Sequence, residues 1–288
     1  MKNIVILIIL LFPVLSFSQE STASKNAAIL SWRKSIVHIN MIEQKYLNAR
    51  EGEIAIDKGT ATLFVHNNRK YLLTARHNVL DTTLSQIQNK PVYKSIFIEP
   101  PFETIVDDST NKARFLINSL SSNLAGAIAI GMGDEDIAVI ALQSKVAKDL
   151  LRYIDTAGYQ ALSFAQLNDA LEADYVSEIF AFGFPYSHLG NPIYKKNGEL
   201  LNNLPYIYAS DPFVTHGKVS LLSKYANYFY ADMANSPGFS GGPVIQNNKI
   251  IGVISGTMSY SPDIPLSGFT RIIKLSNLKR YLIELENK

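Results

Sequence analysis

From residue 35 onward the chain is a succession of short runs rich in β-branched and aromatic residues, divided by turn-forming residues. Residues 60–65 and 71–74 are the clearest pair, because the polar turn 66–70 separates them. Many short strands with turns between them predict an all-β sandwich or barrel. The other strands are expected at 35–40, 92–98, 127–130, 137–142, 175–184, 206–209, 213–222, 228–233, 244–245 and 250–255.

Two segments have helical rather than strand-like spacing. Residues 144–174 repeat apolar side chains at helical intervals, and so does the tail from 272 onward. We therefore expect two β-barrels joined by a helical linker and followed by a C-terminal helix. The expected organisation is a signal peptide at 1–18, a lead-in at 19–34, an N-terminal barrel at 35–143, a linker at 144–174, a C-terminal barrel at 175–271 and a helix at 272–288.

Composition removes several classes of function. The 288 residues are 47% hydrophobic, which is enough for a substantial core. A net charge of +2, with no run of five basic residues, argues against a nucleic-acid partner. The absence of cysteine excludes disulfides, thiolate metal sites and a cysteine nucleophile.

The first 18 residues resemble a signal peptide. Lys2 precedes an apolar stretch at 4–15, and the small residues Ser16 and Ser18 suit a peptidase cleaving before Gln19. A membrane-spanning helix needs about 20 apolar residues, and this stretch is shorter. We expect an exported protein, periplasmic or secreted, without a stable membrane anchor after cleavage.

The strongest local motif surrounds one serine, Ser240, in the segment Ser-Pro-Gly-Phe-Ser-Gly-Gly-Pro-Val at 236–244. Glycines let a backbone turn tightly and direct N–H groups into one hole, which acyl transfer needs for the charge developing on the carbonyl oxygen. The motif also fits the nucleophile elbow of α/β-hydrolases. In α/β-hydrolases the catalytic histidine follows the serine in the chain, whereas all five histidines here precede Ser240.

A base and an acid are available upstream. His77 follows the apolar run 71–74, so a rigid strand can position it. Asp136 begins another apolar run, where an unpaired carboxylate would be costly and a histidine N–H would remove that cost. Asp134 is the alternative acid, in the preceding turn.

The order His77, Asp136, Ser240 resembles that of the trypsin/chymotrypsin-like serine proteases. Three segments carry the resemblance: Leu-Thr-Ala-Arg-His at 73–77, Asp-Ile-Ala-Val at 136–139 and Gly-Phe-Ser-Gly-Gly-Pro at 238–243. Segments 181–185, 217–220 and 231–233 look most like the bacterial HtrA/DegP-like branch. About 15 residues follow 273, so we expect no PDZ module of the kind found in that branch.

The resemblance implies two six-stranded antiparallel Greek-key barrels of the chymotrypsin type and a serine endopeptidase acting on proteins or peptides. It implies Ser240 as nucleophile, His77 as base and Asp136 as the acid that orients it. The N–H groups of Gly238 and Ser240 would form the oxyanion hole. The substrate pocket would be walled by Ala234, Asn235, Ser236, Ser255, Gly256 and Thr257.

Phe239 departs from the trypsin pattern, in which an acid precedes the nucleophile and pairs with a new N-terminus. Activation by that switch is therefore not expected. No histidine spacing predicts a metal site, and no cofactor is expected. Two alternatives stay open: an inactive binding protein with the protease fold, and an esterase on the same fold.

Overall fold

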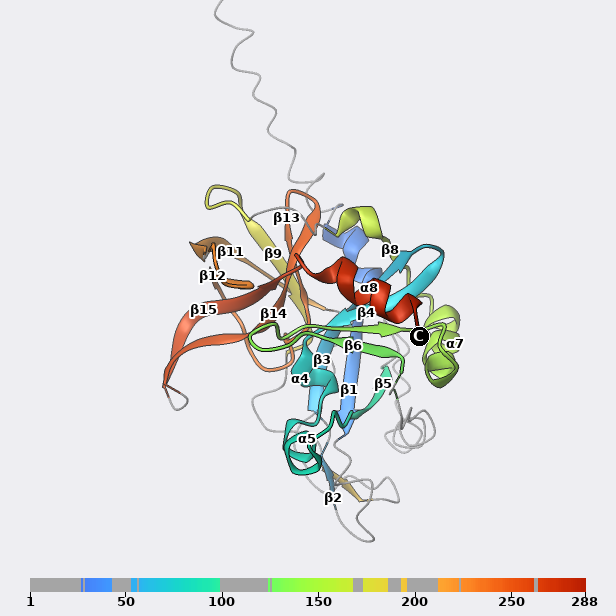
Figure 1. Cartoon of the computed structure of the whole chain (residues 1–288). Coiled ribbons are helices and arrows are strands. Elements are labelled where there is room, and N and C mark those ends of the chain that lie inside the picture. Colours follow the sequence, from blue (N-terminus) through green and yellow to red (C-terminus); the bar gives the residue numbers. More distant parts are fainter. Residues whose placement is uncertain are drawn as a thin grey trace, which may run out of the picture. The chain divides into compact units, whose positions relative to one another are not determined.

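The structure is a computed structural model that describes residues 27, 29–42, 53–55, 57–98, 124, 126–167, 173–185, 193–195, 212–222, 224–261 and 264–288. Two compact units are separated at residue 33. In the first unit, 29–32 are helical. The second unit, 34–288, contains both β regions (Figure 1). The expected signal peptide at 1–18 and the expected strand at 206–209 lie outside the described residues.

The first β region is a curled sheet. Its order is β5-β1-β3-β4-β7-β6, with antiparallel neighbours, and β8 pairs in parallel with β3. These strands are β1 (Ile36–Ile42), β3 (Asp57–His66), β4 (Arg69–Thr74), β5 (Ser95–Ile98), β6 (Ile128–Ile130), β7 (Ala138–Ala141) and β8 (Leu162–Ser163). A separate two-stranded sheet pairs β2 (Glu53–Ala55) with β10 (Ile193–Lys195).

The expected closure of this first region into a six-stranded barrel is not found among the described strands. The edge strands β5 and β6 instead lie against helices: α7 (Lys148–Thr156) contacts β5, and α8 (Leu278–Glu286) contacts β6 and β7. A helix that covers an exposed strand edge is a common alternative to closing the sheet.

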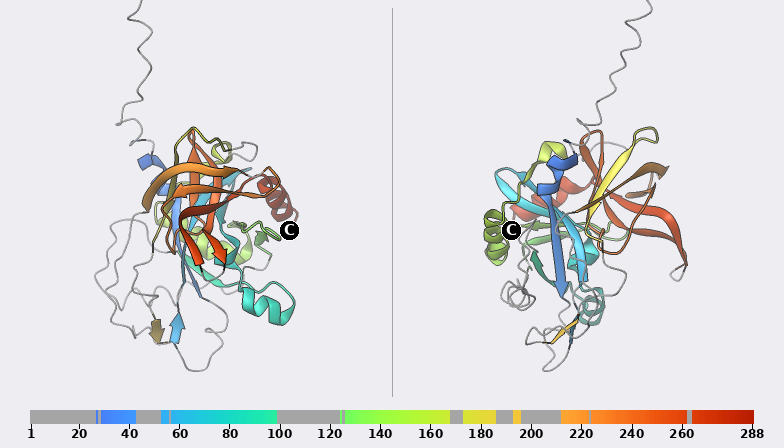
Figure 2. Two further views of the ribbon diagram at one scale, coloured as in Figure 1. Left: turned by 90° about the vertical axis from the view of Figure 1, so that its left-hand side faces the viewer. Right: turned by 180° about the vertical axis from the view of Figure 1, so that it is seen from behind.

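The second β region is a closed barrel, as expected for this half of the chain. The strand order is β11-β12-β15-β14-β13-β9, with antiparallel pairs throughout (Figure 2). Its strands are β9 (Ile179–Gly183), β11 (Phe213–Leu222), β12 (Tyr228–Met233), β13 (Pro243–Gln246), β14 (Lys249–Ser261) and β15 (Ile264–Lys274).

The expected linker and tail are partly helical. The linker holds the 3-10 turns η2 (Lys145–Ala147) and η3 (Phe164–Gln166) as well as α7, but also contributes β8 to the first sheet. The tail helix begins at Leu278 rather than 272, because Ile272 and Ile273 complete strand β15 in the barrel core. No described helix is long and apolar enough to cross a membrane.

Strands β1 and β3 are buried on both faces, which explains how the first sheet reaches the site. Val37 and Ile39 on β1 and Leu63 on β3 point into the core of the first region. The alternate residues His38, on β1, and Thr60, on β3, are equally inaccessible but polar. Since successive side chains of a strand point to opposite faces, this polar face turns towards the barrel, where Thr60 bonds to the serine loop.

Candidate active site

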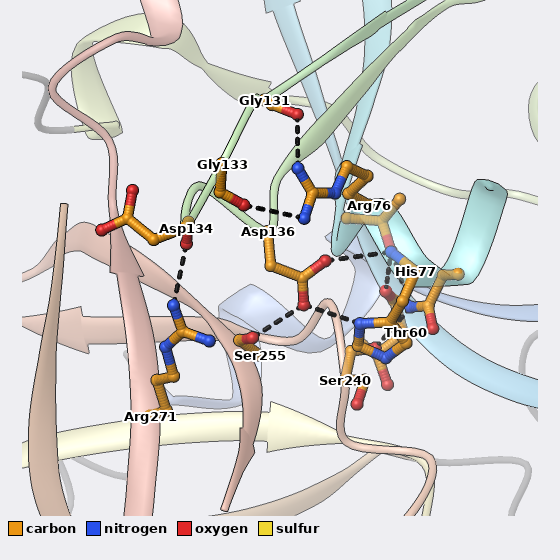
Figure 3. Close-up of polar contacts among 12 residues, drawn as sticks. Thr60, Arg76, His77, Gly131, Gly133, Asp134, Asp136, Ser240, Ser255 and Arg271 are labelled. Carbon is orange, nitrogen blue, oxygen red and sulfur yellow. Dashed lines mark hydrogen bonds and ion pairs between the residues drawn. The ribbon is translucent and has the colours of Figure 1, made fainter. Parts of the chain in front are cut away.

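His77 lies where a buried strand gives way to a single helical turn. Strand β4 ends at Thr74, and α4 (Arg76–Val79) carries His77. The neighbouring Arg76 guanidinium donates to the carbonyl of Gly131 at 2.8 Å and to that of Gly133 at 3.0 Å (Figure 3). Arg76 thus ties the histidine turn to the turn that leads into Asp136.

The Asp136 carboxylate is paired with His77 through both oxygens. Nδ1 of the imidazole lies 2.6 Å from Oδ2, and the backbone N–H of His77 donates to Oδ1 at 3.0 Å. The Ser255 hydroxyl donates to Oδ2 at 2.7 Å. Burial alone would raise the pKa of Asp136, but the hydrogen bonds and the charge of His77, with help from Ser255, lower it to about 2. Asp136 is therefore ionised at neutral pH and can hold the imidazole in one orientation.

The two preceding acids have other partners. The Asp134 carboxylate is directed away from His77 (Figure 3). It accepts a hydrogen bond from Asn227 at 3.3 Å. The buried carboxylate of Glu135 accepts hydrogen bonds from Asn277 and Tyr281, near and on α8. Of the two acids considered from the sequence, the structure brings only Asp136 to His77.

The serine loop depends on its glycines. Gly238 and Gly241 have φ of +96° and +88°, a region that strains other residues. A Cβ on Gly241 would lie 2.0 Å from the carbonyl oxygen of Thr60, and one on Gly242 would lie 2.0 Å from that of Phe182. The loop can therefore approach both sheets only with glycine at these positions.

Ser240 is held close to the histidine turn. Asn78, the residue after His77, donates from its side-chain amide to the Ser240 carbonyl at 2.8 Å, and Figure 3 draws Ser240 beside the His77 ring. Among the described residues the Ser240 hydroxyl makes no hydrogen bond to the imidazole. Such bonds are often long without substrate and tighten in the complex.

The N–H groups of Gly238 and Ser240 have no acceptor within the part of the chain that the structure describes. Their neighbours do: Phe239 N–H donates to Ser236, and Gly241 N–H donates to Ile254. Two unoccupied donors on one tight loop are what an oxyanion site requires.

The six expected pocket residues divide into two segments, one after a strand and one inside a strand. Ala234, Asn235 and Ser236 follow β12, and Ser255, Gly256 and Thr257 lie within β14. A register shift against β15 occurs at Ser255, and bulges of this kind re-aim a side chain. The Ser255 hydroxyl consequently points to Asp136, a role that the sequence did not indicate.

Sequence reasoning also missed Thr60 and Asn78, which bond to the serine loop. The sequence offers two weak signals for them: Asn78 is a polar residue next to His77, and Thr60 is a polar residue in the run 60–65. No group of three His, Asp or Glu side chains among the described residues could hold a metal ion.

A closed antiparallel barrel and a curled sheet that meet at a His–Asp pair and a glycine-rich serine loop define the class of trypsin-like folds. Residues 59–253 match the family model described as a trypsin-like peptidase domain, and the chain belongs to this family. A comparison with individually curated proteins gave no match.

Proposed function

We propose that this protein is a serine endopeptidase with His77, Asp136 and Ser240 as its catalytic triad. The observation that carries the proposal is the His77–Asp136 pair, at 2.6 Å with both carboxylate oxygens engaged. It lies next to a serine loop with two N–H groups that have no acceptor among the described residues. Membership of the trypsin-like peptidase family supports a hydrolase with peptide substrates.

In the proposed reaction, Nε2 of His77 takes the proton of the Ser240 hydroxyl as its oxygen attacks the scissile carbonyl. Asp136 bonds to Nδ1 on the far side of the ring, which fixes the tautomer and stabilises the imidazolium. The oxyanion is received by the N–H groups of Gly238 and Ser240. The imidazolium then protonates the leaving amine, and water repeats the sequence to release the acyl group. This chemistry needs no cofactor.

The test compares the wild type with Ser240→Ala and His77→Ala on peptide and ester substrates, with a fluorophosphonate probe for an activated serine. Loss of a triad member costs about 10⁴–10⁶ in turnover in known serine proteases, and the fold should persist. Full activity in Ser240→Ala would overturn the mechanism. An unreactive wild type would support the inactive binding protein, and ester turnover without peptide turnover would support the esterase.

We further propose export and a relationship to the HtrA/DegP-like branch, both on sequence grounds. The apolar stretch at 4–15 supports cleavage near Gln19, and the segments 181–185 and 217–220 support the branch.

Phe239 is buried where its ring leaves no room for a side chain at Gly183. No N-terminal charge can pair with Phe239, so the form that begins at Gln19 should be active without further processing. N-terminal sequencing of the exported protein, and activity of that form against one extended by a few residues, would test this. A large loss in the extended form would contradict it.

A further inference from the structure

The carbonyl groups at both ends of the segment Gly238–Ser240 are held by the first sheet. The Thr60 hydroxyl donates to the Gly238 carbonyl at 2.7 Å. The Ser240 carbonyl accepts two hydrogen bonds, from the Thr60 backbone N–H at 2.9 Å and from the Asn78 amide at 2.8 Å. These contacts join residues about 160–180 positions apart in the chain.

Thr60 is itself held by two further hydrogen bonds. Its hydroxyl accepts the N–H of Phe184 at 3.1 Å, and its carbonyl accepts the Thr74 hydroxyl at 2.7 Å. The residue is fully buried. Asn78 is fixed in turn by its second hydrogen bond, to the Thr74 hydroxyl at 3.0 Å, and lies over Gly59, where a Cβ would be 2.6 Å from its Nδ2.

The direction of a carbonyl fixes the whole plane of its peptide group. The held carbonyls of Gly238 and Ser240 thus fix two peptide planes. The Ser240 N–H belongs to the peptide group between these two planes, and the Gly238 N–H belongs to the peptide group just before them. Gly238 has a φ of +96°, and glycine alone would leave this part of the loop free to rotate. With both carbonyls turned towards Thr60 and Asn78, rotation of the neighbouring N–H groups is restricted.

We infer that Thr60 and Asn78 are positioning residues that hold the oxyanion-binding N–H groups of Gly238 and Ser240 in a receptive orientation before substrate arrives. The inference rests on the proposed acyl-transfer function. It gives the first sheet a second task besides carrying His77 and Asp136. It also explains how the loop is ordered although Phe239 occupies the position where trypsin-type enzymes use an ion pair.

The decisive variant is Thr60→Val, which keeps the shape of the side chain and removes the hydroxyl. Thr62→Val is the matched control: Thr62 is equally buried two residues along β3, and its hydroxyl has no hydrogen-bond partner among the described residues. Loss of one oxyanion donor outright costs about 10²–10³ in kcat. Loss of a residue that only orients the donors should cost less, about 10- to 100-fold, mainly in kcat with KM little changed.

Thr60→Ser restores the hydroxyl without the methyl group and should recover most of the lost kcat. Asn78→Ala removes one of the two donors to Ser240 and should give a smaller loss. A peptide boronic acid, whose adduct occupies the oxyanion site, should bind more weakly to Thr60→Val, whereas the affinity for the amine product, which does not reach that site, should stay unchanged. Equal losses in Thr60→Val and Thr62→Val, or no recovery in Thr60→Ser, would overturn the inference.

Hydrogen exchange of residues 238–242 in the full chain gives a readout independent of catalysis. The N–H groups of Gly241 and Gly242 are bonded to Ile254 and Phe239, so they should exchange slowly in the wild type. Exchange should be faster in Thr60→Val and unchanged in Thr62→Val. If the wild type proves inactive but this difference appears, the proposed function fails and the positioning role stands. If exchange is the same in both variants, the positioning role fails.

Discussion

Asp136 keeps its charge in a largely buried place because donors occupy both of its oxygens. His77 provides two of them and Ser255 the third. Hydrogen bonds of this kind stabilise the ionised carboxylate more than the protonated form, although the group is largely removed from water. The same bonds that stabilise the charge also prevent the imidazole from turning.

The two acids considered as partners of His77 should respond differently to neutralisation. In trypsin-type triads, Asp→Asn lowers kcat by about 10⁴ because the imidazole adopts the wrong tautomer. Asp136→Asn should follow this pattern, since its Oδ2 bonds to Nδ1. Asp134→Asn should have a mild effect, because its contact is with Asn227. Rates of peptide hydrolysis by the two variants measure the difference. A severe loss in Asp134→Asn with a mild loss in Asp136→Asn would show that Asp134 is the acid.

The pH dependence of stability should also report on Asp136. Its pKa is about 2 in the folded state against an ordinary 3.8. A carboxyl with a pKa lowered by folding stabilises the fold above its unfolded pKa, and this contribution disappears as the pH falls through the folded pKa. The lowering is equivalent to about 2 kcal/mol. The difference in unfolding free energy between wild type and Asp136→Asn, from urea titrations, should therefore shrink by that amount from pH 5 to pH 2. A difference independent of pH would contradict the assignment.

The three residues proposed as the catalytic triad could be singled out in the sequence, whereas the residues that hydrogen-bond to them or to the serine loop could not. His77, Asp136 and Ser240 stand out because each lies in a segment of unusual composition. Thr60, Asn78 and Ser255 act through contacts between segments distant in the chain. Their residue types are ordinary in strands and turns, so only the packed structure gives them a role.

At the scale of elements, the turn before β7 connects three parts of the molecule. Its successive acids bond in different directions: Asp134 to Asn227, Glu135 to α8 and Asp136 to His77. The Arg271 guanidinium also donates to the Asp134 carbonyl at 2.9 Å. The sequence alone indicates only that Asp134 and Asp136 are alternative partners for His77, whereas in the structure each of the three acids has its own partner.

The contact between Glu135 and α8 should be important for stability. Burial, together with the hydrogen bond that the Tyr281 hydroxyl donates to the buried Glu135 carboxylate, raises the pKa of Tyr281 to about 12. Tyr281→Phe would remove this donor and leave Oε2 of Glu135 with the longer contact from Arg280 at 3.2 Å, at a cost of about 1–3 kcal/mol. Ile283→Ala, on the exposed face of the same helix, is the control and should change stability little. Urea unfolding measures both, and equal effects would show that the hydroxyl contributes nothing.

The elements themselves were predictable where local chemistry decides them. Asn67 and Asn68, and again Asn247 and Asn248, adopt positive φ in the two-residue turns of hairpins, as asparagine readily does. The start of α8 was less predictable, because Ile272 and Ile273 suit the apolar face of a helix and a barrel strand equally. The covering of β5 and β6 by helices depends on tertiary contacts that no local pattern contains.

At the scale of the whole second unit, the two β regions are joined by the parts of the site. The first provides His77 and Asp136, the second provides Ser240, and hydrogen bonds from Thr60 and Asn78 cross between them. A buried polar face on β1 and β3 would be costly without partners. At Thr60, the serine loop supplies such a partner, so the interface and the site stabilise one another.

The substrate pocket proposed from the sequence should accept an uncharged residue before the cut. None of the six pocket residues is charged, and the nearby Asp232 is exposed on β12. A charged substrate side chain would therefore be buried without compensation. We expect cleavage after Val, Ala, Thr or Leu, with peptide-library profiling as the measurement. Trypsin carries its pocket aspartate six residues before the nucleophile, a spacing that here falls on Ala234. Ala234→Asp should thus introduce cleavage after Lys and Arg, whereas Thr62→Val should leave the cleavage profile unchanged.

For the wild type, dominant cleavage after Arg, Lys, Asp or Glu would contradict the prediction. It would show that a charged residue outside these six determines which substrate residue is accepted.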